Sequence, residues 1–222
     1  MEFQVLDSQK TKVSGKVIGG SQVAVSYETI AGNSPATYGN FMAIWQDTKL
    51  PYVYKDGKGA VTEPIKRNSI VGNTPTGSQP FTGLDVQSKP YIVGYGTGAD
   101  LTSVCSTVIF LPGGEISTFE TTISVESVFT DFITVRFDTP SGNRPKTNNN
   151  WIGVWEGTQP AFNCSDYKVK QRVTVDRSRD VEALSFPVRT DTDYTIAYGT
   201  GSGCSDIAAY VVIRTSVFMA QG

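Results

Sequence analysis

The sequence predicts an all-β protein made of two tandem immunoglobulin-like β-sandwich domains that arose by internal duplication. The first observation is that apolar and polar residues alternate with a period of two in several segments. The second is that two blocks of the 222-residue chain occur twice. The third is the composition, because 22 Gly and 11 Pro beside only 18% charged residues are typical of short strands joined by turns.

The duplication is visible without gaps. Residues 23–45 align with 133–155 at an offset of 110, and eight of these 23 positions are identical. Residues 91–110 align with 194–213 at an offset of 103, so the first repeat carries about seven more residues between its blocks.

The predicted domains are residues 1–112 and 115–222, joined at Pro112-Gly113-Gly114. The segment 52–90 contains the extra residues and is rich in Gly, Pro, Lys and Thr, so we expect surface loops there.

Each repeat predicts the same order of strands. Alternation in Val23–Tyr27 and Ile133–Asp138 indicates strands with one face in the core. A Gly-Asn-x-Pro loop follows, and then a strand that is apolar on both faces, which we expect to be covered on both sides. A Tyr-x-x-x-Tyr strand, a Gly-Thr-Gly turn and a final β-branched strand complete about seven strands per repeat.

Two of these strands carry a family resemblance. Asn150–Trp155 and Tyr194–Tyr198 match a D/N-W-I-G-I/V-F/W/Y strand and a Y-x-F/I-x-Y strand near the end of the domain, and Asn40–Trp45 with Tyr91–Tyr95 match them loosely. The pattern resembles the SKICH-type sandwich and the N-terminal sandwich of purple acid phosphatases. The resemblance covers about a third of each repeat and implies an immunoglobulin-like sandwich that serves in binding or targeting, with no catalytic residues.

Composition excludes several functions. With 19 basic and 21 acidic residues the net charge is −2, which argues against binding to nucleic acid phosphates. The absence of histidine excludes His-dependent nucleophilic catalysis and imidazole-ligated metals.

Candidate ligand-binding residues lie in the duplicated blocks. A Trp ring stacks on the apolar face of a sugar while amides and carboxylates bind its hydroxyls. The alternative places both tryptophans in the core, and it places the asparagines in backbone bonds of the Gly-Asn-x-Pro loops. The candidates are Trp45, Trp155, Asn40, Asn150, Asp47 and Glu156.

The Gly-Thr-Gly turns supply a second group of candidates, because loop tips on rigid sandwiches usually carry specificity. This group consists of Tyr95, Tyr198, Asp100 and Asp206. Calcium binding by Asp100, Asp166, Asp191, Asp193 and Asp206 is a weaker reading, since no calcium-loop motif is present; we expect no metal and no cofactor.

Three cysteines permit one disulfide, for which Cys164 and Cys204 are the candidate pair in an oxidising setting, and we expect Cys105 to be a buried apolar residue. Asn163-Cys164-Ser165 matches a glycosylation sequon. The first residues lack a signal-peptide pattern, and the longest apolar runs, such as 207–213, are too short to span a bilayer. We therefore expect a mature secreted form or a cytoplasmic protein released non-classically.

The sequence favours a non-enzymatic recognition protein, lectin-like or cell-surface-binding, and compatible with a defence or toxin component. Its partner would be a glycan or a cell-surface receptor, with a membrane surface as a further candidate, and homo-oligomers are compatible with the sequence. Two alternatives stay open: a membrane-active or self-assembling toxin or structural protein, and, least favoured, a carboxylate-based hydrolase.

Overall fold

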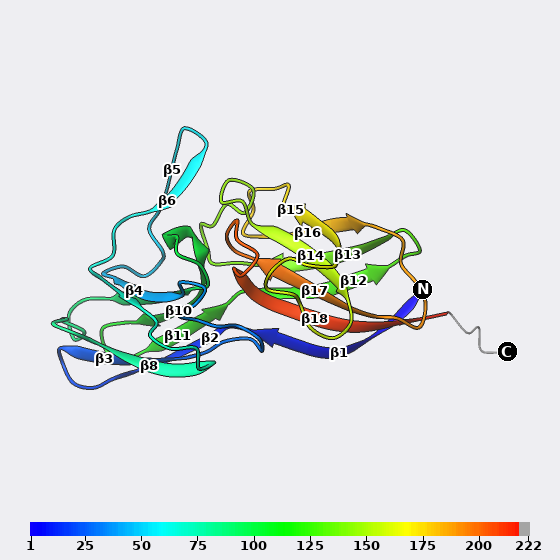
Figure 1. Cartoon of the computed structure of the whole chain (residues 1–222). Coiled ribbons are helices and arrows are strands. Elements are labelled where there is room, and N and C mark those ends of the chain that lie inside the picture. Colours follow the sequence, from blue (N-terminus) through cyan, green and yellow to red (C-terminus); the bar gives the residue numbers. More distant parts are fainter. Residues whose placement is uncertain (218–222) are drawn as a thin grey trace.

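The computed structural model describes residues 1–217 and shows an all-β chain with two sandwiches (Figure 1). In the first, a three-stranded sheet (β2-β3-β8) faces a five-stranded sheet (β11-β10-β9-β4-β7). The strands are β2 (Lys12–Val17), β3 (Gln22–Glu28), β8 (Thr76–Thr82), β4 (Phe41–Trp45), β7 (Lys66–Ser69), β9 (Tyr91–Gly96), β10 (Val104–Phe110) and β11 (Ile116–Glu120).

The second sandwich repeats this arrangement with the orders β12-β13-β16 and β1-β18-β17-β14-β15. Its strands are β12 (Thr122–Val128), β13 (Phe132–Asp138), β16 (Arg179–Ser185), β1 (Glu2–Lys10), β14 (Trp151–Glu156), β15 (Tyr167–Arg172), β17 (Asp193–Gly199) and β18 (Ile207–Ser216). The predicted fold of two immunoglobulin-like sandwiches is therefore correct.

The two repeats exchange their first strands. β1 begins the first repeat but pairs antiparallel with β18, the last strand of the second (Figure 1, blue beside red). β11 begins the second repeat but pairs with β10 of the first. At the crossing points the Thr11 and Thr121 amides donate to the carbonyls of Ala208 and Cys105, both at 2.9 Å.

This exchange differs from the expected domain limits of 1–112 and 115–222. Residues 2–10 lie in the sheet of the second repeat and residues 116–120 in that of the first. Periodicity reveals which face of a strand is apolar, but it does not reveal which neighbouring strand supplies the hydrogen bonds.

The segment 52–90 forms strands where the sequence suggested surface loops. It contains β7, β8 and a hairpin of β5 (Tyr52–Lys55) and β6 (Lys58–Val61) that projects from the first sandwich (Figure 1, cyan). These strands are short or lie at sheet edges with exposed faces, so their composition resembles that of loops. Strand pairing shows that the offset between the repeats has changed to 103 by β7. Phe41 pairs with Ser69, and its counterpart Trp151 pairs with Arg172, which lies 103 residues after Ser69.

The strands β4 and β14 are buried on both faces, as expected. One face of each lies in its own sandwich core. The outer face of β4 is covered by Leu50, Val61 and Leu101. The outer face of β14 is covered by Phe162 and by Ile30 of the first repeat, so the repeats share an apolar interface.

Candidate functional site

Trp45 and Trp155 are core residues. Each is only 3% exposed, and their indole nitrogens donate to the carbonyls of Thr62 (2.7 Å) and Ser165 (2.9 Å). Neither ring has a free face on which a sugar could stack. The structure thus favours the core alternative over sugar stacking at these positions.

Asn40 and Asn150 hold the duplicated loops against the sheets. The side-chain oxygen of Asn40 accepts from Asn33 Nδ2 at 2.8 Å and from the Tyr95 hydroxyl at 2.9 Å. The Asn40 side-chain nitrogen donates to the backbone carbonyl of Thr97. Burial raises the pKa of the Tyr95 hydroxyl far above its ordinary range, so this group stays a donor.

The second repeat reproduces this network. The side-chain oxygen of Asn150 accepts from Asn143 Nδ2 at 2.9 Å and from the Tyr198 hydroxyl at 3.0 Å. The Asn150 side-chain nitrogen donates to the backbone carbonyl of Thr200. All four side chains are buried. The loops are therefore alike because both repeats need the same internal bonds, and Asn40, Asn150, Tyr95 and Tyr198 are buried away from any ligand.

Asp47 and Glu156 satisfy local groups at the surface. The Asp47 carboxylate accepts from the amides of Thr48 at 2.7 Å and Lys49 at 3.3 Å. Glu156 pairs with Lys168 at 3.1 Å and Arg189 at 3.7 Å. Neither lines the groove described below.

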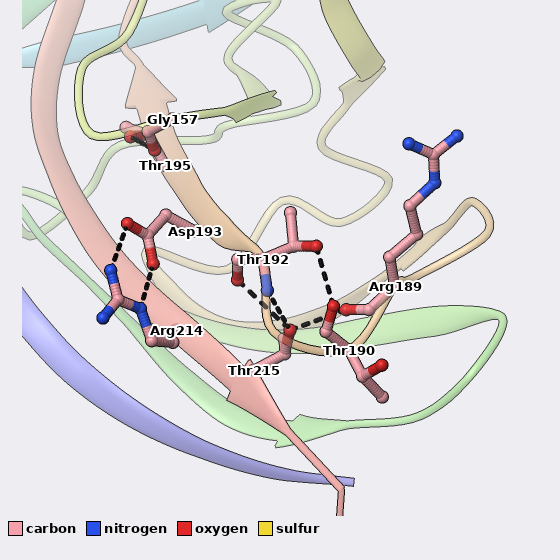
Figure 2. A network of polar contacts seen from close by, with 8 residues as sticks. All are labelled: Gly157, Arg189, Thr190, Thr192, Asp193, Thr195, Arg214 and Thr215. Atoms are coloured by element: carbon pink, nitrogen blue, oxygen red, sulfur yellow. Dashed lines mark hydrogen bonds and ion pairs between the residues drawn. The ribbon is translucent and has the colours of Figure 1, made fainter.

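Asp193 is also occupied. Its carboxylate forms a two-pronged ion pair with Arg214, at 2.7 and 2.8 Å, which lowers the pKa of Asp193 (Figure 2). Beside it the Thr215 hydroxyl donates to the Arg189 carbonyl at 2.6 Å and fixes the turn before β17. Within residues 1–217 no group of three or more Asp, Glu, Cys or His side chains is placed to hold a metal ion.

The repeats meet at their Gly-Thr-Gly turns. We call residues 97–103 and 200–206 the first and second tip loops; they align at the offset of 103. The Thr97 hydroxyl contacts the Thr200 hydroxyl at 2.9 Å and donates to the Asp206 carbonyl at 3.1 Å. The Thr200 hydroxyl reaches the Ser103 carbonyl at 3.0 Å, which is the equivalent bond in the opposite direction.

A second reciprocal contact extends this symmetry. A Cβ on Gly32 would lie 2.9 Å from the Phe162 ring, and one on Gly142 would lie 3.2 Å from the Tyr52 ring. Gly142 corresponds to Gly32 and Phe162 to Tyr52 at the offset of 110. The repeats are therefore related by an approximate two-fold axis that passes between Thr97 and Thr200.

The β5–β6 hairpin breaks this symmetry. The Tyr54 hydroxyl donates to the Gly142 carbonyl at 2.9 Å and accepts from the Arg144 amide at 2.8 Å. The Arg144 guanidinium lies 4.4 Å from the centre of the Tyr54 ring. The hairpin thereby reaches from the first repeat onto a loop of the second and closes one side of a groove.

This groove has a volume of about 740 Å³ and lies between the repeats. Its walls are the hairpin turn, both tip loops and the loop before β14 of the second repeat. The lining residues are Gly57, Lys58, Gly59, Ala99, Asp100, Thr102, Lys146, Thr147, Asn148, Asn149, Asp176, Gly201, Ser202, Gly203 and Asp206. Of the predicted residues, the structure brings Asp100 and Asp206 together here.

Asp206 is the most enclosed carboxylate of the groove. It accepts from the Gly203 amide at 2.8 Å, and a Cβ on Gly98, Gly201 or Gly203 would lie between 2.2 and 2.8 Å from its oxygens. Burial raises the pKa of Asp206, and the nearby Asp100 carboxylate adds to the effect. The equivalent residue of the first repeat is Ser103, so this carboxylate occurs only once.

The groove also carries positive charge. Lys58 and Lys146 form no ion pair with any residue that the structure describes. Asp176 accepts from the amide and hydroxyl of Thr147, at 2.9 and 2.8 Å, and shapes the wall. The groove thus presents carboxylates, ammonium groups and glycine backbone together.

The predicted disulfide is present, with the Cα atoms of Cys164 and Cys204 5.3 Å apart. Cys105 is buried, as predicted, and burial raises the pKa of its thiol to about 12. It lacks the thiolate character that a reactive cysteine needs at neutral pH.

Sequence reasoning did not single out Lys58, Lys146, Asn148 or Asp176 as site residues. The duplication highlights what the repeats share, whereas the groove forms where they differ. Lys58 lies in the inserted hairpin, and the other three acquire their place only through contact between repeats.

Comparison with known proteins gives fold-level likenesses only. No family model and no curated protein matches the chain. A red sea bream transglutaminase is 11% identical with a TM-score of 0.30, over 96% of this chain and 32% of that one. Domains 3 and 4 of rat CD4 are 11% identical with a TM-score of 0.27, over 86% and 93%.

A Salmonella alpha-2-macroglobulin is 8% identical with a TM-score of 0.28, over 93% of this chain and 17% of that one. This chain thus spans about a third of the transglutaminase and a smaller part of the macroglobulin. The SKICH-type resemblance stays a prediction. No helix among residues 1–217 is long and apolar enough to span a bilayer.

Proposed function

We propose that this protein is a non-enzymatic recognition protein that binds a glycan in the groove between its repeats. The observation that carries the proposal is the lining of the groove, where carboxylates and ammonium groups that form no ion pairs within residues 1–217 lie beside glycine backbone. Its volume is within the range of small-molecule sites, which is about 300–1,000 Å³.

The chemistry of this lining suits hydroxyl groups. A sugar hydroxyl donates one hydrogen bond and accepts others. Asp100 and Asp206 supply acceptors, while Lys58 and Lys146 supply donors from the other walls. Bonds to charged groups contribute about 1.5–3 kcal/mol each, which supports binding without aromatic stacking.

The site is composite, and this changes the expected stoichiometry. Two buried tryptophans do not make two equivalent sites, and the groove needs both tip loops and the inserted hairpin. We therefore expect one glycan per chain. Avidity for a glycan-coated surface would then require several chains.

A glycan array tests the proposal. The intact protein is compared with the double variant Asp100→Asn/Asp206→Asn and with Asp47→Asn as the matched control outside the groove. Circular dichroism checks that all three fold. We expect selective binding by the intact protein and the control, and at least a tenfold loss in the double variant.

Three results would contradict the proposal. Equal binding by the double variant would place the ligand elsewhere. Absence of binding to every glycan, with dye leakage from liposomes, would favour the membrane-active alternative. Cleavage of a bound glycan that the double variant lacks would make Asp100 and Asp206 a catalytic pair.

A further inference from the structure

The disulfide lies directly behind the wall of the groove. Cys204 lies in the second tip loop between Gly203 and Asp206, which both line the groove. Cys164 lies in the loop after β14, next to Phe162 at the interface between repeats. The bond thus ties a wall of the groove to the body of the second sandwich across a sequence separation of 40 residues.

The first repeat holds its tip loop by other means. Its loop contains the 3-10 helix η1 (Leu101–Ser103), which contacts β6. The Ser103 hydroxyl donates to the Asp100 carbonyl at 2.6 Å and accepts from the Gly98 amide at 3.1 Å. Cys204 and Cys164 occupy the positions of Leu101 and Tyr54, and in the first repeat Leu101 packs in one apolar cluster with Val61 of the hairpin instead of forming a cross-link.

Between its bonded ends, Thr200 and Asp206, the second tip loop has few other contacts. Four of its seven residues, 200–206, are Gly or Ser, and it contains no helical turn. Its remaining contacts include the bond from Trp151 Nε1 to the Gly203 carbonyl at 3.2 Å and the bond from the Gly203 amide to Asp206. Such a loop loses much order when a cross-link is removed, because glycine has the largest backbone entropy.

A basic side chain lies next to both sulfur atoms of the disulfide. Lys170 Nζ, on β15, is 3.2 Å from Cys164 Sγ and 3.5 Å from Cys204 Sγ, and 4.3 Å from the centre of the Trp151 ring. The first repeat places Arg67 over Phe41 at the equivalent positions, where it donates to the Ala99 carbonyl instead. An ammonium group beside a sulfur stabilises the thiolate that leaves when a disulfide is attacked.

We propose that the Cys164–Cys204 disulfide is a redox switch that controls the second tip loop and thereby the groove. A thiolate of a dithiol reductant attacks Cys204 Sγ, and the sulfur–sulfur bond breaks. Cys164 leaves as a thiolate beside Lys170. The second thiol of the reductant then displaces Cys204, so two electrons and two protons pass to the protein and the reductant becomes a cyclic disulfide.

Regulation of ligand binding rests on the proposed function, but movement of the loop does not. Reduction frees Gly201–Ser205 from the loop after β14, while Thr200 and the Asp206 backbone stay bonded to the first tip loop. The stretch between these two anchors loses its fixed position, and the Asp206 carboxylate loses the fixed Gly203 amide that orients it. We therefore expect a reduced protein that is folded but binds its glycan at least tenfold more weakly.

Hydrogen exchange tests the switch without any ligand. The full-length protein is measured before and after treatment with dithiothreitol, beside the variant Cys164→Ser/Cys204→Ser. We expect faster exchange in residues 199–206 and 162–165 of the reduced protein and of the variant. Residues 22–28 of β3, in the outer sheet of the first sandwich, serve as the internal control and keep their exchange rates.

Unchanged exchange in residues 199–206 after complete reduction would overturn the switch. If exchange accelerates but no glycan binds the oxidised protein, the switch stands and the proposed function fails. If glycans bind the oxidised and the reduced protein equally, the switch does not control the groove.

The role of Lys170 has its own test in the rate of reduction. Lys170→Met should slow reduction by dithiothreitol about threefold for each unit by which the ammonium lowers the pKa of the leaving thiol. Lys170→Arg should restore the rate, and Lys168→Met, two residues away, is the control. Reduction of Lys170→Met at the rate of the unmodified protein would exclude this positioning role.

Discussion

The hydroxyl oxygens of Thr97 and Thr200 lie 2.9 Å apart at the approximate two-fold axis that relates the two repeats. Each hydroxyl also reaches a carbonyl of the opposite tip loop. Together with the exchanged strands β1 and β11, this contact gives the chain the reciprocal interface of a symmetric dimer. The repeats therefore form one interlocked unit.

Removal of these hydroxyls should weaken the unit. Thr97→Val and Thr200→Val should each lower the free energy of unfolding by about 1–2 kcal/mol, because each leaves buried polar groups unpaired. In the double variant the losses should fall short of their sum by about 0.5 kcal/mol or more. Urea unfolding measures these values, with exposed Thr76→Val as control; strictly additive losses would argue against direct coupling.

The buried asparagine network should be costly to remove. Asn150→Ala leaves the Tyr198 hydroxyl and the Asn143 amide without their shared acceptor, so we expect a loss of about 3 kcal/mol in unfolding free energy. Asn40→Ala should give a similar loss, and exposed Gln46→Ala should change it by less than about 0.5 kcal/mol. Thermal or urea denaturation provides the measurement. A near-neutral Asn150→Ala would mean that the repeated loop has another purpose.

The disulfide should contribute to stability as well as to the groove. In the chain-entropy model, a cross-link that closes a loop of about 40 residues lowers the entropy of the unfolded chain and so raises its free energy by about 4 kcal/mol. Cys164→Ser/Cys204→Ser should therefore lower the unfolding free energy by about 3–4 kcal/mol under oxidising conditions. Cys105→Ala leaves the bridge intact and is the control. Equal stability of the bridged and unbridged proteins would contradict this prediction.

Asp206 should make stability depend on pH. Its pKa in the folded protein is raised above the usual 3.8 by burial, so the folded state binds more protons than the unfolded state between these two pKa values. Stability from this group is therefore lost as pH rises through that window. Asp206→Asn lacks this titration, so its stability relative to the unmodified protein should improve from pH 3.5 to pH 7.5.

Urea unfolding at both pH values provides that comparison. The asparagine still accepts a hydrogen bond from the Gly203 amide, so the variant should fold at both. A stability difference that does not change with pH would show that Asp206 titrates alike in both states.

Much of the fold follows from local patterns in the sequence. Alternation placed Val25 and Val135 in the cores, and the apolar strands β4 and β14 were correctly expected to be covered on both faces. The exchange of β1 and β11 could not be predicted, because the free energy that favours one sheet over the other depends on contacts between distant segments. Strands β5 to β8 were missed because exposed edge strands have the composition of loops.

The candidate site could not be found from the residues that the two repeats share. Residues conserved between the repeats, such as Trp45, Asn40 and Tyr95, are buried and serve the fold. Asp206 and Lys58 differ between the repeats or lie in the insertion, and they line the groove. Similarity within a duplicated chain therefore identified structural needs, and the differences identified the candidate site.

The stoichiometry of glycan binding tests the central claim most directly. Isothermal titration calorimetry of the intact, oxidised protein, with the glycan that binds most tightly on the array, should give one binding site per chain, because the groove needs both repeats. Asp206→Asn should weaken that site. Two equivalent sites per chain, or a single site that is indifferent to Asp206→Asn, would contradict a composite groove as the site of recognition.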